Sequence, residues 1–189
     1  MRDGSATRKK LNRCALDLFV VKGVSATTIK DIATKAGIAE GTLYRHYTSK
    51  EELATSLFVD SYEKITGELK EIAMSSDKIA EQIKNIVDLM CEHFDDDPVL
   101  FRYLLLSQHH QIKYLSNEPN NAHYFFVNIL TQAMNSGQVP QGDPHHYAST
   151  VMGILLQAAV SRVYKRINRT MKEDATLLTD TVFSALQIK

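Results

Sequence analysis

Residues 27–53 read TTIKDIATKAGIAEGTLYRHYTSKEEL, and this stretch decides how the rest of the chain is organised. Thr28 and Asp31 have the spacing of a capping box, in which a hydroxyl and a carboxylate satisfy the N–H groups that open a helix. Apolar residues then recur at helical spacing until Gly37, where a positive φ angle can end the helix. A first short helix is therefore predicted from Thr28 to Gly37.

A second short helix is predicted at about residues 40–47. It is too short to be stable alone, so Leu43 and Tyr47 must hold it by packing. Its other face carries small, hydroxylated and basic groups. Two short helices joined by a tight turn, with such a face on the second, are typical of a helix-turn-helix that enters the major groove of DNA.

The stretch resembles the DNA-binding signature of the TetR family of transcriptional regulators, in the pattern AG-I-x-x-GTLY-x-H-Y-x-SKE-x-L. The resemblance covers roughly residues 8–53 and implies a three-helix DNA-binding head followed by a helical body. One departure is Ala39, because the family often has Ser where the recognition helix begins. Without that hydroxyl the helix lacks an N-cap worth ~1 kcal/mol, although a backbone N–H could still meet a phosphate.

By position in this motif, a set of residues in the head is expected to contact DNA. The set is Thr28, Lys30, Ala39, Glu40, Gly41, Thr42, Tyr44, Arg45, His46 and Lys50. Tyr44 and His46 resemble family positions that contact phosphates, and Lys50 is expected to reach the DNA backbone from the start of the long helix. Arg45 could pair with a guanine or with a phosphate. Glu40 either favours the helix N-terminus or accepts from a cytosine amino group.

The charge of the chain is divided unevenly between the motif and the rest. The 189 residues have a net charge of zero. Residues 1–53 carry ten Lys/Arg against six Asp/Glu, a net of +4, and residues 54–189 carry twelve against sixteen, a net of −4. A basic head and an acidic body are consistent with DNA binding. The cations of a basic arm, Arg2, Arg8, Lys9, Lys10 and Arg13, either contact phosphates or are solvated.

Amphipathic periodicity predicts helices along the whole chain. The first runs over residues 10–22, a long one reaches about residue 74, and further helices follow up to residue 188. No alternating run indicates a strand. We therefore expect an all-α fold, with a helix-turn-helix domain at 1–53 and a larger effector-binding and dimerisation domain at 54–189. The long helix, ~35 Å in length, would connect the two.

The last two helices, at about residues 144–167 and 172–188, are expected to form a homodimer. They carry the small and branched side chains of a four-helix bundle, and Gly153 would permit the close approach of another helix or of a ligand. One head reads only a half-site, so a dimer would bind a palindromic operator. The alternative is that these helices complete a monomeric core.

The middle helices hold many large aromatic, Met and polar residues, which could line a pocket for a small molecule. The candidates are Tyr62, Met90, His93, Phe94, Tyr103, His110, Tyr124, Phe125, Met134, Met152 and Gln157. Each could instead be an ordinary core residue. The few inward charges favour an apolar or aromatic effector. The adjacent His145 and His146 are expected to be solvated.

The sequence favours a TetR-like regulator, with repression more expected than activation, over two alternatives. A carboxylate-bridged metal enzyme would need paired E-x-x-H motifs, which are absent from the sequence. A helix-turn-helix regulator that answers to a protein partner, or to no effector, stays open. No cofactor, metal or membrane span is expected. Cys14 and Cys91 read as core thiols of a cytoplasmic protein.

Overall fold

The computed structural model describes residues 4–111 and 121–188, with side chains for 5–107 and 121–188. Within these ranges every regular element is a helix, as the sequence predicted. None of the described helices is long and apolar enough to cross a membrane.

The chain divides into two compact units. Unit 1 comprises Met1–Tyr62 with Val99–Tyr114, and unit 2 comprises Glu63–Pro98 with Leu115–Lys189. These units are defined by packing alone. The functional boundary between residues 53 and 54 therefore stays a prediction.

Unit 1 is built from the first helices of the chain and one later helix. They are α1 (Gly4–Lys22), α2 (Ile29–Ala36), α3 (Glu40–Leu43), the first half of α4 (Lys50–Ser75) and most of α6 (Pro98–Gln111). Helix α2 packs against both α1 and α3. The fully buried side chains at the centre include Leu11, Ile32, Leu43, Leu53 and Phe58.

Helix α1 begins earlier than predicted. It starts at Gly4 rather than at residue 10. The basic arm is therefore helical over its described part, because Ala6, Arg8, Lys9 and Lys10 are all good helix formers. Its cations consequently project from a fixed helix.

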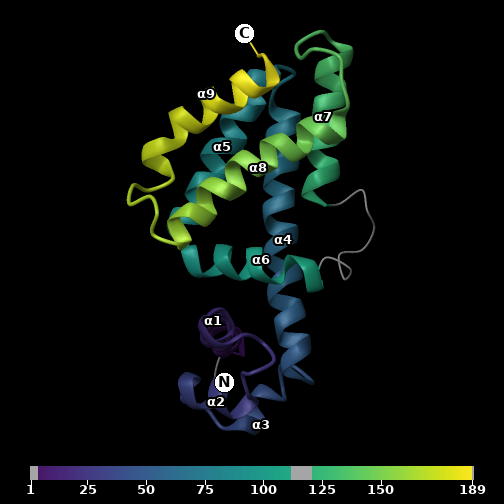
Figure 1. Ribbon diagram of the computed structural model, residues 1–189. Coiled ribbons are helices and arrows are strands. Elements are labelled where there is room, and N and C mark those ends of the chain that lie inside the picture. The colour runs from purple at the N-terminus through teal and green to yellow at the C-terminus, as the bar shows by residue number, and fades with distance from the viewer. Residues whose placement is uncertain (1–3, 112–120, 189) are drawn as a thin grey trace. The chain divides into compact units, whose positions relative to one another are not determined.

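Unit 2 contains the remaining helices. They are the second half of α4, α5 (Ile79–Asp96), α7 (Ala122–Asn135), α8 (Pro144–Val163), the short 3₁₀ helix η3 (Lys172–Asp174) and α9 (Ala175–Leu186). Helices α8 and α9 pack against each other, and both contact α5 (Figure 1). Helix α7 lies against α8.

A buried ion pair holds the loop between α8 and α9. Helix α8 is also shorter than the sequence predicted. The largely buried Arg162 pairs with Asp174 at 2.6 Å and donates to the carbonyls of Arg169 and Thr170. Lys165 adopts a φ of 55°, so α8 ends at Val163 rather than near residue 167. The contact spans twelve residues, and no local sequence pattern indicated it.

Helix α8 is apolar on more than one face. Ala148, Val151, Leu155 and Ala159 are buried within unit 2. A second stripe of half-buried apolar residues runs along the same helix: Met152, Leu156, Val160 and Val163. A Cβ added at Gly153 would meet no atom within 4 Å, so nothing in the described chain approaches this glycine closely.

Candidate nucleic-acid interface

Helix α2 has the predicted boundaries at both ends. The Thr28 hydroxyl accepts from the Asp31 N–H at 3.1 Å, and the Asp31 carboxylate accepts from the Thr28 N–H at 3.0 Å. The Thr28 backbone N–H, followed by the Thr28 hydroxyl, stabilises the Asp31 carboxylate and holds the pKa of Asp31 below its ordinary value. At the other end Gly37 has a φ of 65°, and the Ile38 N–H reaches back to the Ala33 carbonyl. The capping box and the glycine stop are both confirmed.

Helix α3 is shorter than the predicted 40–47. Only Glu40–Leu43 are α-helical. Beyond them the N–H groups of Arg45 and His46 bond three residues back, to Thr42 and Leu43, so the chain continues as a tighter turn. Ala39 occupies the N-cap with extended dihedrals and makes no side-chain cap. The missing hydroxyl leaves this helix start without the usual side-chain support.

The inner face of this segment is held as the sequence predicted. Leu43 is completely buried, and Tyr47 is 3% exposed. The Tyr47 hydroxyl donates to Asn12 at 2.7 Å and accepts from Arg8 at 3.0 Å, so it ties the segment after α3 to α1. The outer face is therefore presented by a fixed scaffold.

The outer face is exposed and basic. Lys30, Tyr44 and Arg45 are exposed, with Tyr44 at 55%. Among the described residues, none forms a hydrogen bond or ion pair with the side chains of these three. Thr42 and His46 are half-buried on the same segment, and Ala39, Glu40 and Gly41 are exposed. Such a surface can offer cations, hydroxyls and close backbone approach to a nucleic acid.

The basic arm is only partly available for an outside partner. Arg8 lies over the Tyr47 ring and pairs with Asp60 at 3.7 Å, and Arg13 pairs with Asp17 at 3.2 Å. Lys9 and Lys10 form no ion pair with any described residue. Arg2 lies outside the described residues.

Lys50, predicted to contact a phosphate, has hydrogen-bond partners inside unit 1. Its ammonium donates to three backbone carbonyls of the loop between α1 and α2, those of Val24, Ser25 and Thr27. Its side chain is 20% exposed. The contacts join residues 23 to 26 positions apart, and no helical or strand periodicity could have indicated them.

At the start of α4, Ser49 and Glu52 also have the spacing of a capping box, which forms only in part. The Glu52 N–H donates to the Ser49 hydroxyl at 3.0 Å. The Glu52 carboxylate, however, accepts from both the N–H and the hydroxyl of Thr48. These two bonds, the hydroxyl first, lower the pKa of Glu52.

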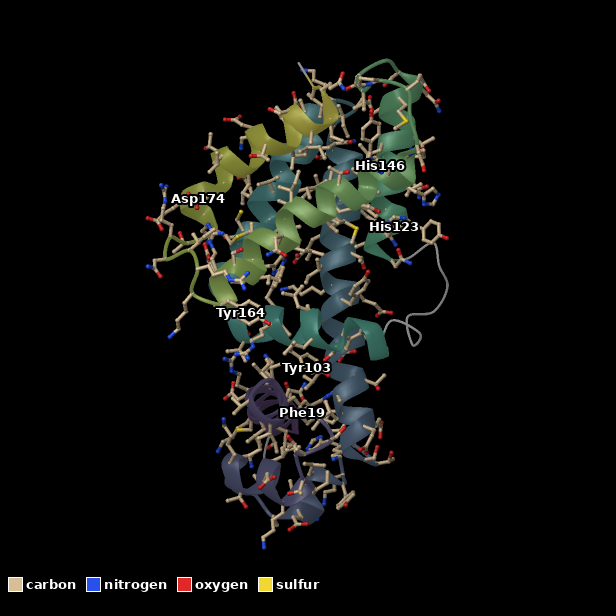
Figure 2. The ribbon with its side chains drawn as sticks, in the orientation of Figure 1. Phe19, Tyr103, His123, His146, Tyr164 and Asp174 are labelled. Carbon is tan, nitrogen blue, oxygen red and sulfur yellow. The ribbon has the colours of Figure 1, made fainter. Side chains whose placement is uncertain are left out.

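The predicted effector residues are divided between the two units. Tyr62 and Tyr103 belong to unit 1. Tyr103 extends from α6 toward Phe19 of α1, with ring centroids 6.0 Å apart, and donates to the Ala54 carbonyl at 2.7 Å (Figure 2). Burial raises its pKa to about 12. Tyr103 is thus part of the core that supports the helix-turn-helix.

The His110 side chain lies outside the described residues. The other remaining candidates belong to unit 2. Phe94 and Phe125 are buried, Met90, Tyr124 and Met152 are half-buried, and Gln157 is exposed. A cavity of about 650 Å³ in unit 2 is lined by Met134 and by residues that were not predicted, including Ile79, Gln138, Val139 and Ile188. A smaller one of about 280 Å³ shares Ile79 and Gln138 with it. Of the predicted effector residues, Met134 lines the larger cavity, and the others with described side chains line neither.

The histidines were only partly anticipated. His145 and His146 are exposed at the start of α8, as expected. The sequence did not indicate that His145 Nδ1 lies 3.0 Å from His123 Nε2. No group of three or more His, Cys, Asp or Glu side chains that could hold a metal occurs among the described residues.

Comparison with known proteins finds a matching family model, related sequences and related structures. Residues 13–57 match the family model for "Bacterial regulatory proteins, tetR family". Over 138 residues the chain is 25% identical to the HTH-type transcriptional repressor KstR2 of Mycobacterium tuberculosis, covering 70% of this chain and 69% of the repressor.

Two solved structures share the fold over nearly the whole chain. The fatty acid degradation regulator FadR of Bacillus halodurans superposes with a TM-score of 0.79 at 16% identity, covering 97% of each chain. FadR of Bacillus subtilis, solved in complex with stearoyl-CoA, gives 0.74 at 17% identity, covering 93% of this chain and 97% of that one.

Proposed function

This chain is a TetR-family transcriptional regulator and not an enzyme, and from that premise we propose that it is a dimeric repressor of a palindromic operator, released or modulated by a small molecule. One observation carries the DNA-binding part of the proposal. The side chains of Lys30, Tyr44 and Arg45 are exposed and have no hydrogen-bond or ion-pair partner among the described residues, while Leu43 and Tyr47 are buried and hold the segment that carries Tyr44 and Arg45. A rigid scaffold that presents such side chains is suited to a major groove.

The predicted DNA-contact residues other than Lys50 keep their proposed roles. Thr28 and Lys30 would meet the phosphate backbone at the start of α2. Gly41 would allow the main chain to approach closely, with Thr42 near a thymine methyl or a phosphate. The remaining contacts are proposed for Ala39, Glu40, Tyr44, Arg45 and His46.

The test of this surface is the replacement of one exposed cation. Arg45→Gln is expected to weaken operator binding and to reduce the slope of log K against log salt by about 0.9 for each subunit, if Arg45 pairs with a phosphate. If Arg45 pairs with guanine, the sequence preference should relax at one position. Lys64→Gln removes an exposed cation from unit 2 and should change neither quantity. An Arg45 variant with wild-type binding would contradict the proposed surface.

The dimer is proposed to form through α8 and α9. The apolar stripe of α8 is only half-buried and Leu177 of α9 is 63% exposed, so the described part of the chain leaves apolar surface on both helices uncovered, which supports this placement. The open space around Gly153 is also consistent with the approach of a second copy.

The dimer test uses charge at that face. Leu156→Glu and Leu177→Glu are each expected to shift the protein toward monomer in sedimentation velocity at micromolar concentration. Met74→Glu is the matched control, because Met74 is an exposed apolar residue at 87% on a different helix. A wild-type protein that sediments as a monomer would contradict the proposal.

The effector is proposed to bind in unit 2 and to have a large apolar part. The stearoyl-CoA complex of the Bacillus subtilis relative and the cavities of unit 2 support this class of ligand. Helix α4 belongs to both units, so a ligand that alters its second half could change the separation of two heads in a dimer. The coupling equals the difference in ligand affinity between free and operator-bound protein.

The effector test is operator release by stearoyl-CoA, with free coenzyme A as the control. Release by the acyl form alone is expected. Equal affinity of stearoyl-CoA for free and operator-bound protein would contradict the mechanism for this ligand. Failure of a broad panel of apolar molecules to bind would favour the second candidate, a regulator that answers to a protein partner or to no effector.

A further inference from the structure

The ammonium of Lys50 has a complete set of partners inside the protein. It donates to the Val24 and Ser25 carbonyls at 2.9 Å each and to the Thr27 carbonyl at 2.7 Å. A lysine ammonium has three protons, so all three are used. The Glu51 carboxylate is the nearest counter-ion, at 3.8 Å. A phosphate would have to displace one of these carbonyls to become a direct partner.

The position of Lys50 in its own helix does not account for this arrangement. Lys50 is the first residue of α4. A cation at a helix N-terminus lies at the positive end of the helix dipole, where a carboxylate is the favoured residue. The local helix therefore gains nothing from the ammonium. Three carbonyl oxygens that converge on one point, by contrast, repel each other unless a cation or donors lie between them.

The loop that Lys50 holds leads directly into α2. Thr27 is fully buried, and its hydroxyl donates to the Gly23 carbonyl at 2.8 Å. The next residue, Thr28, is the N-cap of α2, and Lys30 lies in the first turn. The orientation of this turn therefore depends on the loop that the Lys50 ammonium fastens to the start of α4.

We propose that Lys50 is a positioning residue for operator binding: its ammonium fixes the α1–α2 loop and thereby the N-terminal turn of α2, and it makes no phosphate contact of its own. This inference rests on the proposed operator binding by the head. It assigns Lys50 a role distinct from that of the exposed Lys30, although both are lysines of the same small domain.

The experiment compares Lys50→Met, Lys50→Arg and Lys30→Gln in the full-length protein. The probe is a DNA duplex selected from a random-sequence library by the wild-type protein. Binding is titrated against salt at a temperature well below the unfolding transition of each variant. Hydrogen exchange of the Val24–Thr28 amides is measured in parallel.

Lys50→Met is expected to bind the duplex on the order of tenfold more weakly at fixed salt, because several charge-assisted hydrogen bonds are lost. Its slope of log K against log salt should equal that of the wild type, since no phosphate contact is removed. Faster amide exchange in the α1–α2 loop should accompany the loss. Lys30→Gln should leave the loop unchanged and reduce the slope by about 0.9 per subunit.

Lys50→Arg separates charge from geometry. A planar guanidinium keeps the positive charge and binds phosphate well, but it cannot reproduce three converging ammonium donors. We expect it to bind more weakly than the wild type with an unchanged slope. Wild-type affinity in Lys50→Arg combined with a reduced slope in Lys50→Met would identify a phosphate contact and overturn the proposal.

Two further outcomes are decisive. A Lys50→Met variant that unfolds more easily yet binds with wild-type affinity in the cold would make Lys50 merely structural and would also overturn the proposal. If the wild-type protein selects no sequence from the library, the proposed operator binding itself fails. That result is distinct from any result on Lys50.

Discussion

Tyr103 buries a whole phenol ring in unit 1 and still gives its hydroxyl a partner, the Ala54 carbonyl. Tyr103→Phe is expected to lower the free energy of unfolding by ~1 kcal/mol, the net value of one hydrogen bond. Tyr103→Ala should cost ~3–5 kcal/mol, because it also removes the packing against Phe19. Urea denaturation measures both. Equal losses in the two variants would show that the ring contributes little.

The two thiols should differ in reactivity. Cys91 is fully buried, and burial, followed by the charge of Asp95, raises its pKa to about 11. Cys14 is half-buried. Because the thiolate is the reactive form, iodoacetamide at pH 8 should label Cys14 in the native protein before Cys91. Peptide mass spectrometry gives the order. Preferential labelling of Cys91 would contradict the packing of α5.

At the scale of single elements, α3 has an identifiable weakness at its start. The Ala39 backbone has the extended dihedrals of an N-cap, but its side chain offers no acceptor. Ala39→Thr is expected to stabilise the protein by ~1 kcal/mol relative to Ala39→Val, a variant of the same shape without the hydroxyl. Thermal unfolding of the pair tests this. Identical stabilities would mean that water or the neighbouring backbone already satisfies the helix start.

The caps of α2 and α4 make stability depend on pH. The folded-state pKa values of Asp31 and Glu52 lie below their ordinary values of 3.8 and 4.5. The unfolded chain therefore binds protons more readily, so the contribution of both caps is fully present above about pH 4.5. It is lost as the pH falls through the lowered folded-state values.

Asp31→Asn and Glu52→Gln should accordingly be less stable than the wild type at pH 7, and the difference should shrink below pH 4. Urea denaturation at a series of pH values measures the difference. A gap that widened on acidification would reverse the expected sign and contradict the capping geometry.

The sequence predicted those features of the elements that depend on near neighbours. The Thr28–Asp31 box, the Gly37 stop and the burial of Leu43 were all predictable, because each follows from residues a few positions apart. The carbonyl contacts of Lys50 and the place of Tyr103 were not. They depend on segments that meet only after folding, and no periodicity describes such a meeting.

Sequence patterns report on residues that are close together in the chain, and this explains how the two sets of site residues were predicted. The residues predicted to contact DNA, apart from Lys50, lie within residues 28–46 in and beside two short helices, so a local sequence pattern was enough to group them. The effector residues were chosen by side-chain type from several helices. The cavities of unit 2 instead lie near Gln138, where the end of α7 meets the start of α5. A cavity is a property of packing, and composition does not locate it.

For the whole molecule, the division of charge is the simplest property with a functional consequence. Residues 1–53 have a net charge of +4, and the remainder has −4. Attraction to DNA should therefore be confined to one part of the chain, while the other part opposes non-specific adhesion. Binding should depend steeply on salt even though the protein as a whole is neutral.

The most direct test of the central claim is a footprint of the protein on the DNA around its own gene, titrated with salt. We expect a protected palindrome whose half-site centres lie about one helical turn apart. We also expect two subunits per site and an affinity that falls steeply as salt rises. Protection without sequence preference, or of a single half-site by one subunit, would contradict the claim that this chain is a dimeric operator-binding regulator.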